Sequence, residues 1–187
     1  MRLIAVVLVA ALPCAAQGPF GKRNADYYKH NLAPYVVSPQ MIVDRMLEAA
    51  SLKPGETVYD LGCGDGRILI TAVQRFRAKA IGVELSEAVA KAAEDSIKRL
   101  NLQNEAVVIH GDLMTVNLAP ADVVTIYLET SSNELVRPNL EKYLHAGARV
   151  VSYEFAVPGW KANRVEKIDA YNRSHQIFLY IMPAKKN

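Results

Sequence analysis

Residues 58–67 read Val58-Tyr59-Asp60-Leu61-Gly62-Cys63-Gly64-Asp65-Gly66-Arg67. A β-prone run, 57–61, leads into this glycine-rich turn, and a helix-compatible stretch, 67–76, follows it directly. Three glycines at alternating positions allow a positive backbone φ and let a ligand approach the main chain without meeting a Cβ atom. The stretch therefore predicts a strand, a tight ligand-binding loop and the beginning of a helix.

Two common phosphate-binding motifs do not match this loop. A P-loop requires Lys-Ser or Lys-Thr after its glycines, and the dinucleotide fingerprint fails because the third glycine comes one position too early. Asp60 and Asp65 flank the glycines, and carboxylates are poor neighbours for a pyrophosphate. The loop is better suited to a cationic or hydroxyl-rich ligand.

A second acidic residue, Glu84, ends the next predicted strand, 79–84. In Rossmann-like sheets an acid about 20 residues beyond the glycine loop hydrogen-bonds ribose hydroxyls. Glycine loop and acid together predict an adenosine ligand. The alternative is an ordinary β–α turn with acids that bind nothing.

These motifs resemble those of the class I S-adenosylmethionine-dependent methyltransferases, whose first motif corresponds to Asp60-x-Gly62-x-Gly64-x-Gly66 here. The resemblance implies S-adenosyl-L-methionine as the cofactor. Its amino-acid half would lie over the glycine loop, its ribose at Glu84, and its adenine beside Asp112. The implied cofactor-binding residues are Asp60, Gly62, Gly64, Asp65, Gly66, Glu84, Asp112 and Leu113.

Strand and helix patterns alternate along the chain and end in two strands joined by a short turn. This order predicts an α/β fold, a Rossmann-like methyltransferase sandwich with a mostly parallel seven-stranded sheet that ends in an antiparallel hairpin. A first helix, with Ser38 as N-cap and Pro39 as its first residue, would cover one side of the cofactor cleft. The expected strands are 57–61, 79–84, 106–110, 123–128, 148–153, 164–168 and 176–182, and the helix before the fifth strand is expected at 133–144.

The N-terminus resembles a secretory signal peptide. Met1-Arg2 precedes an apolar run, 3–12, and small residues up to Ala16, a pattern typical of export with cleavage. We therefore expect a leader at 1–16, a flexible arm at 17–33, a methyltransferase domain at 34–187, and an exported or periplasmic protein. The run is shorter than the about 20 residues that span a bilayer, so the mature chain is expected to have no membrane span; the alternatives are an uncleaved membrane anchor or a cytoplasmic protein.

Composition indicates one soluble globular domain. The net charge of +3 is small and its basic residues are interspersed with acids, which argues against a nucleic-acid partner. After cleavage Cys63 would be the one remaining cysteine, so an intramolecular disulfide is excluded. No metal site is expected, and the oligomeric state is not indicated.

The acceptor should approach the segment after the fourth strand, because ligands bind at the carboxyl ends of the strands in such sheets. This segment, 127–133, lacks the Asn/Asp-Pro-Pro-Tyr motif of many amide and ring-nitrogen methyltransferases, which argues against nucleobase and glutamine acceptors. Two residues are candidate catalytic groups. Glu129 could accept a proton or hold an ammonium, or it could only cap a helix or face solvent. Tyr35 could close over the methyl donor, or only pack against the first helix.

A narrower resemblance covers most of the mature chain. Pro34-Tyr35-Val36, 60–68, and 146–152 followed by Pro158-x-Trp160 resemble a group of small methyltransferases with bacterial members and mitochondrial relatives that methylate lysine in membrane proteins. The resemblance implies a protein-lysine acceptor. A small-molecule acceptor and a non-catalytic binding module that keeps the nucleotide fold are the alternatives, and the intact cofactor motifs favour an enzyme.

Overall fold

The computed structural model describes residues 32–184, and the predicted leader and nearly all of the predicted arm lie outside them. The described residues contain a seven-stranded sheet with the order β3-β2-β1-β4-β5-β7-β6. The first five strands are parallel, whereas β7 runs antiparallel to β5 and β6. The predicted fold class is confirmed. The strands are β1 (Thr57–Leu61), β2 (Lys79–Glu84), β3 (Ala106–His110), β4 (Val123–Ile126), β5 (Arg149–Tyr153), β6 (Arg164–Ala170) and β7 (Arg173–Ile181).

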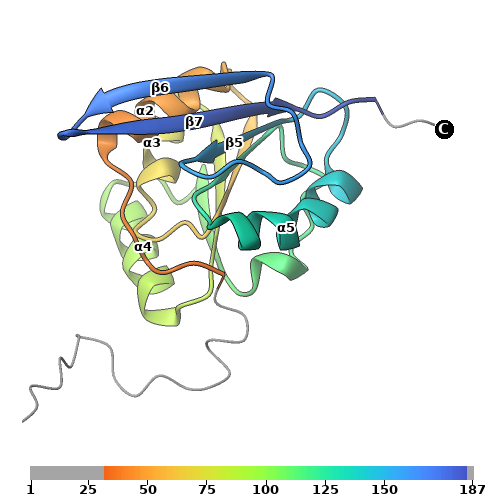
Figure 1. The fold of residues 1–187 in the computed structure, drawn as a ribbon. Coiled ribbons are helices and arrows are strands. Elements are labelled where there is room, and N and C mark those ends of the chain that lie inside the picture. Colours follow the sequence, from red (N-terminus) through yellow and green to blue (C-terminus); the bar gives the residue numbers. More distant parts are fainter. Residues whose placement is uncertain (1–31, 185–187) are drawn as a thin grey trace, which may run out of the picture. The chain divides into compact units, whose positions relative to one another are not determined.

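Helices cover both faces of the sheet (Figure 1). One face packs against α2 (Gln40–Ala49), α3 (Arg67–Phe76) and α4 (Glu87–Arg99), and the other packs against α5 (Thr130–Tyr143). A short 3₁₀ turn, η1 (Leu113–Thr115), follows β3. Every residue of β4 is buried, because a central parallel strand has helices or other core residues on both of its faces.

Several element boundaries differ from the predictions by one to three residues, and three of them lie in segments that border the site. The N–H groups of Ile42 and Val43 donate to the Pro39 carbonyl at 2.9 and 3.1 Å, so Pro39 and not Ser38 is the N-cap of α2. The Asn133 N–H donates to the Glu129 carbonyl at 2.8 Å, so α5 begins at Thr130, three residues earlier than predicted. The β4 ladder ends at Ile126, two residues short of the predicted end.

The β6–β7 hairpin is longer than predicted and turns where it was predicted to turn. Tyr171 and Asn172 both have positive φ values, 52° and 60°, as a two-residue type I′ turn requires. The turn lies at the edge of the sheet where β5 ends, because Tyr153 pairs with Ile177 of β7. The carboxyl ends of β1, β2, β4 and β5 meet at this same edge, where the site is found.

No helix among residues 32–184 is both long enough and apolar enough to cross a bilayer.

Candidate active site

The glycine loop leaves β1 in a left-handed backbone conformation. Gly62, Gly64 and Gly66 have φ values of 86°, 55° and 79°, a region that residues with a Cβ rarely adopt. The N–H groups of Gly62 and Cys63 donate to the Val83 carbonyl at 2.8 and 3.0 Å, which fastens the loop to the end of β2. A Cβ on Gly64 would lie 2.8 Å from Cε2 of Tyr35, so the space above the loop has no room for a side chain.

Glu84 ties this loop to the next helix. Its Oε2 accepts a hydrogen bond from the Gly64 N–H at 3.1 Å, and its Oε1 accepts one from the Ser86 N–H at 2.9 Å. A carboxylate has about four acceptor positions. The two oxygens therefore keep lone pairs for two ligand hydroxyl groups, which fits a ribose.

Asp60 is the buried acid of the site. It is 4% exposed, and the Thr125 hydroxyl donates to its Oδ1 at 2.7 Å. Burial raises the pKa of Asp60 to about 7, and the nearby carboxylates of Glu84 and Asp65 raise it further while the Thr125 hydrogen bond opposes the shift. The Asp60 carboxyl therefore gains or loses its proton near neutral pH, and a cationic ligand close to it would favour the ionised form.

Asp65 and Arg67 connect the glycine loop to the segment that precedes α2. Asp65 holds Arg67 through contacts of 2.6 to 3.2 Å, and the NH1 group of Arg67 donates to the Ser38 carbonyl at 2.7 Å. Partial burial raises the pKa of Asp65, but the hydrogen bonds and positive charge of Arg67 outweigh this effect and keep the pKa below its usual value. At the other end the Ser132 hydroxyl donates to the Leu32 carbonyl. Residues 32–39, which we call the strap, therefore cross the carboxyl edge of the sheet with both ends anchored.

The two candidate catalytic residues lie at this edge. Tyr35 belongs to the strap, is 52% exposed and stands beside Gly64; desolvation raises its pKa, and Asp65 contributes in the same direction. Glu129 is exposed at the N-terminus of α5. Within the described chain its side chain makes no capping hydrogen bond, so the helix-capping alternative finds no support.

The remaining predicted contact residues follow β3. The N–H of Met114 donates to Oδ1 of Asp112 at 2.8 Å, which makes Asp112 the N-cap of η1, and Leu113 is the first residue of that turn. His110 is exposed at the end of β3. His145 lies elsewhere: its Nε2 is 3.4 Å from Asp122, which directly precedes β4 at the opposite edge.

Cys63 is a buried packing residue, 5% exposed. Burial, with a further contribution from Asp60, raises the pKa of its thiol well above the ordinary range. The thiol is therefore unreactive at neutral pH. No group of His, Cys, Asp and Glu that would hold a metal ion occurs among residues 32–184.

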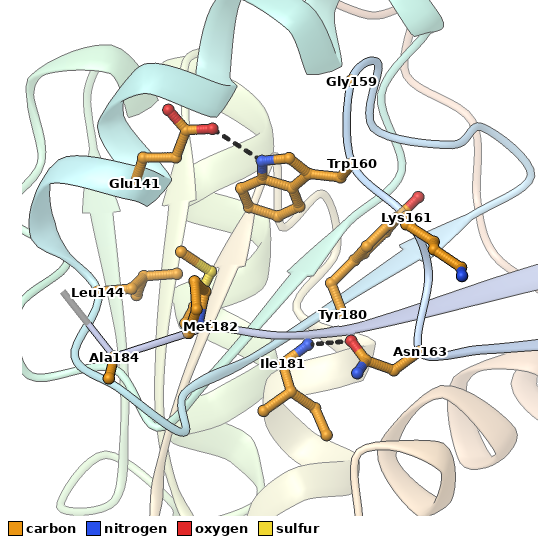
Figure 2. A pocket seen from close by; sticks show the side chains of 11 residues that line it. Glu141, Leu144, Gly159, Trp160, Lys161, Asn163, Tyr180, Ile181, Met182 and Ala184 are labelled. Atoms are coloured by element: carbon orange, nitrogen blue, oxygen red, sulfur yellow. Dashed lines mark hydrogen bonds between the residues drawn. The ribbon is translucent and has the colours of Figure 1, made fainter. Parts of the chain in front are cut away.

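A cavity of about 480 Å³ lies between α5 and the end of β7 (Figure 2). Trp160 donates from Nε1 to Glu141 at 2.8 Å and packs edge-on against Tyr180, with ring centroids 5.3 Å apart. Ile181, which lines the cavity, pairs with Arg149 at the start of β5. The cavity therefore opens at the amino edge of the parallel strands and is not part of the cofactor site.

Sequence reasoning missed a group of aromatic and charged residues where β4, β5 and β7 meet at the carboxyl edge. The group comprises Tyr127, Tyr153, Glu154, Phe155, Arg173 and His175. The one available signal was the position of Tyr127 directly after the apolar β4 run.

Comparisons with known proteins agree with this geometry. Residues 60–164 match the family described as ANTKMT methyltransferase domain. The chain is 42% identical over 154 residues to a protein-lysine N-methyltransferase of Saccharolobus islandicus (strain REY15A), which covers 82% of this chain and 96% of that protein. It is 34% identical over 128 residues to the adenine nucleotide translocase lysine N-methyltransferase of Mus musculus, with 68% of this chain and 56% of that protein covered.

A solved structure extends the comparison. The RNA methyltransferase from Salinibacter ruber in complex with S-adenosyl-L-homocysteine superimposes with a TM-score of 0.75 at 33% identity, over 81% of this chain and 97% of that one. TrmN from Thermus thermophilus superimposes with a TM-score of 0.66 at 15% identity, which reflects the fold alone. The family match spans more than half of the chain.

Proposed function

Because this chain belongs to the ANTKMT methyltransferase domain family and is an S-adenosyl-L-methionine-dependent methyltransferase, we propose that it transfers methyl groups to the side-chain amine of lysine in proteins. The observation that carries the proposal is the 42% identity to a protein-lysine N-methyltransferase over 96% of that relative's length. The match spans 154 residues, 82% of this chain, and so extends well beyond the glycine loop.

The residues at the carboxyl edge fit the cofactor. S-adenosyl-L-methionine, when bound, supplies a methyl group on a positively charged sulfur. We assign the contacts with its amino-acid half to the backbone of Gly62, Gly64 and Gly66, whose positive φ values turn the loop at the end of β1. The ribose hydroxyls are assigned to Glu84, whose oxygens retain free acceptor positions.

Acidic groups around the loop favour a cationic ligand. Asp60 is buried in β1 just before the loop, and Asp65 lies within the loop as the partner of Arg67. We assign the adenine end to Asp112 and Leu113, which follow the neighbouring strand β3. The chain thus offers hydrogen-bond acceptors for the hydroxyls and negative charge for the ammonium and sulfonium groups.

A lysine acceptor must lose a proton before it can attack. With an unperturbed pKa of about 10.4, deprotonation at pH 7 costs roughly 4–5 kcal/mol, which burial or a nearby proton acceptor reduces. We propose that the exposed Glu129 receives the ammonium as it approaches and that Tyr35 screens the reacting groups from water. Methyl transfer then needs alignment more than further chemistry.

RNA is a second candidate acceptor, since one similar solved structure is that of an RNA methyltransferase. Two observations favour protein: the higher identity to the lysine enzyme, and a net charge of only +3, which provides little attraction to phosphate backbones.

The experiment incubates the full chain with methyl-labelled S-adenosyl-L-methionine and, separately, unfolded lysine-rich histones and total RNA. Each product is hydrolysed completely and its labelled residue is identified by chromatography. The proposal predicts label in methyllysine. Label in methylated nucleosides, with none in methyllysine, would establish the RNA alternative.

A further inference from the structure

The segment after β4 adjoins the glycine loop. β4 pairs with β1 on one side, where Ile126 lies opposite Leu61, and with β5 on the other, where Ile126 lies opposite Ser152. One residue beyond that register come Tyr127 and Tyr153, whose ring centroids are 4.3 Å apart. Leu128 in turn contacts the loop, since its Cδ2 lies 3.8 Å from the Cβ position of Gly62. Tyr127 therefore follows β4, the strand that pairs with β1, at the same carboxyl edge as the glycine loop.

Phe155 is folded back onto Tyr127 by a tight reversal at the end of β5. Its N–H donates to the Tyr153 carbonyl at 2.8 Å across Glu154, which has φ +64°. This three-residue turn is rare and unfavourable for a residue with a side chain. The reversal places the Phe155 ring 6.4 Å from that of Tyr127, at an interplanar angle of 23°.

Side chains of β5 and α5 hold this turn in place through hydrogen bonds. The Phe155 carbonyl accepts hydrogen bonds from Ser152 Oγ at 2.5 Å and from Asn133 Nδ2 at 3.0 Å. Asn133 and Ser152 are both fully buried. Because buried polar groups are costly to leave unpaired, these contacts fix the backbone and hence the direction of the Phe155 ring.

A hydrogen-bonded network adjoins the rings; it is buried at Tyr153 and His175 and exposed at Arg173. Nδ1 of His175 lies 2.7 Å from the Tyr153 hydroxyl and 2.9 Å from Oε1 of Glu154. Arg173 donates to that same Glu154 oxygen at 2.9 Å and to the Tyr153 hydroxyl at 3.2 Å. The Glu154 carboxylate offsets the positive charge of Arg173, which also lies within reach of Tyr127.

Tyr127 and Phe155 are half-buried, whereas Tyr153 and His175 are buried. Aromatic faces attract ammonium and alkylammonium groups and accept the aliphatic stem of lysine equally well. We propose that Tyr127 and Phe155 form the subsite that binds the acceptor lysine side chain and directs its nitrogen toward the methyl donor.

This inference rests on the proposed lysine acceptor and adds the residues that bind it. The lysine ammonium first releases a proton to solvent. The nitrogen lone pair then forms the bond to the methyl carbon while the carbon–sulfur bond breaks and its electron pair stays on sulfur. The positive charge thereby moves from sulfur to the methylated nitrogen, where the two rings continue to stabilise it.

The test uses a bisubstrate compound, an S-adenosyl-L-homocysteine analogue in which nitrogen replaces sulfur and carries a lysine side chain. Calorimetry compares its affinity for the full chain with that of S-adenosyl-L-homocysteine itself. The lysine arm is expected to raise the affinity of the wild-type protein at least about tenfold. Tyr127→Leu and Phe155→Leu are each expected to lose about threefold to tenfold of this gain, with unchanged affinity for S-adenosyl-L-homocysteine.

Matched variants separate the subsite from general packing. Tyr127→Phe keeps the ring and should keep the gain, as should Tyr143→Ala, which removes a half-buried tyrosine at the far end of α5. If Phe155→Leu fails to bind S-adenosyl-L-homocysteine, Phe155→Met, which has another unbranched apolar side chain, replaces it.

The outcomes distinguish the two proposals. A gain that survives in both leucine variants overturns the subsite and leaves the lysine acceptor standing. A wild-type protein that binds S-adenosyl-L-homocysteine but gains nothing from the lysine arm overturns the lysine acceptor, and the subsite with it.

Discussion

Replacing Glu84 by alanine removes two structural hydrogen bonds and the proposed ribose ligand together. The carboxylate accepts the Gly64 and Ser86 N–H groups at 3.1 and 2.9 Å. Hydrogen bonds to a charged group contribute about 1.5–3 kcal/mol. If the two ribose hydroxyls together lose one such contribution, the dissociation constant for S-adenosyl-L-homocysteine should rise by about tenfold to 150-fold.

The assay is calorimetric titration of the wild-type protein, Glu84→Gln and Glu84→Ala with S-adenosyl-L-homocysteine. Glutamine keeps one acceptor oxygen and loses the charge, so its affinity should fall between the other two. Glu87→Ala, an exposed acid in the first turn of α4, is the matched control and should bind like the wild type. A Glu84→Ala protein that melts cooperatively and binds within twofold of the wild type would refute the role of Glu84.

Three further predictions follow from the packing and charge of the same region. The folded-state pKa of Asp60 is raised from 3.8 to about 7, so the protonated carboxyl contributes most to stability at low pH, and this contribution is lost as pH rises toward 7. Denaturation at several pH values should show that the free energy of unfolding of the wild type falls relative to that of Asp60→Asn up to about pH 7. A difference in free energy of unfolding between the two proteins that stays constant from pH 4 to 8 would contradict this. Gly82→Ala places a Cβ 2.5 Å from Cys63 Sγ and 2.7 Å from Leu69 Cδ1. Urea denaturation should show that this variant is destabilised by about 1–3 kcal/mol. If Gly82→Ala lowers the free energy of unfolding by the same amount in a Cys63→Ala background, the clash is not with the thiol. Peptide mapping after iodoacetamide treatment should find Cys63 unmodified in the folded protein and modified in urea, and rapid alkylation of the folded protein would show that the thiol is accessible.

Much of the fold follows from local patterns in the sequence. β1, β2 and β3 begin and end at the predicted residues, because each is an apolar run bounded by turn-forming or charged residues. The glycine loop and Glu84 were found by spacing alone. Their proximity then follows from the pairing of two parallel strands, since Asp60 lies opposite Gly82 in the register of β1 and β2.

Features that depend on tertiary contacts were not predicted. The start of α5 was missed because Thr130, Ser131 and Ser132 have the composition of a loop, while the Asn133 to Glu129 backbone bond closes a helical turn there. The approach of Phe155 to Tyr127 was missed because glutamate at 154 gives no sign of a positive φ. That conformation is held by contacts with α5 and β7, which are remote in sequence.

Titration of the full chain with S-adenosyl-L-methionine tests the central claim, that the glycine loop at the carboxyl edge holds the methyl donor. The wild-type protein should bind in the micromolar range, and Gly64→Val should not bind, because a side chain at that position would meet the Tyr35 ring and strain a backbone with φ +55°. Equal affinity of both proteins, or no binding by a folded wild-type protein, would contradict the account.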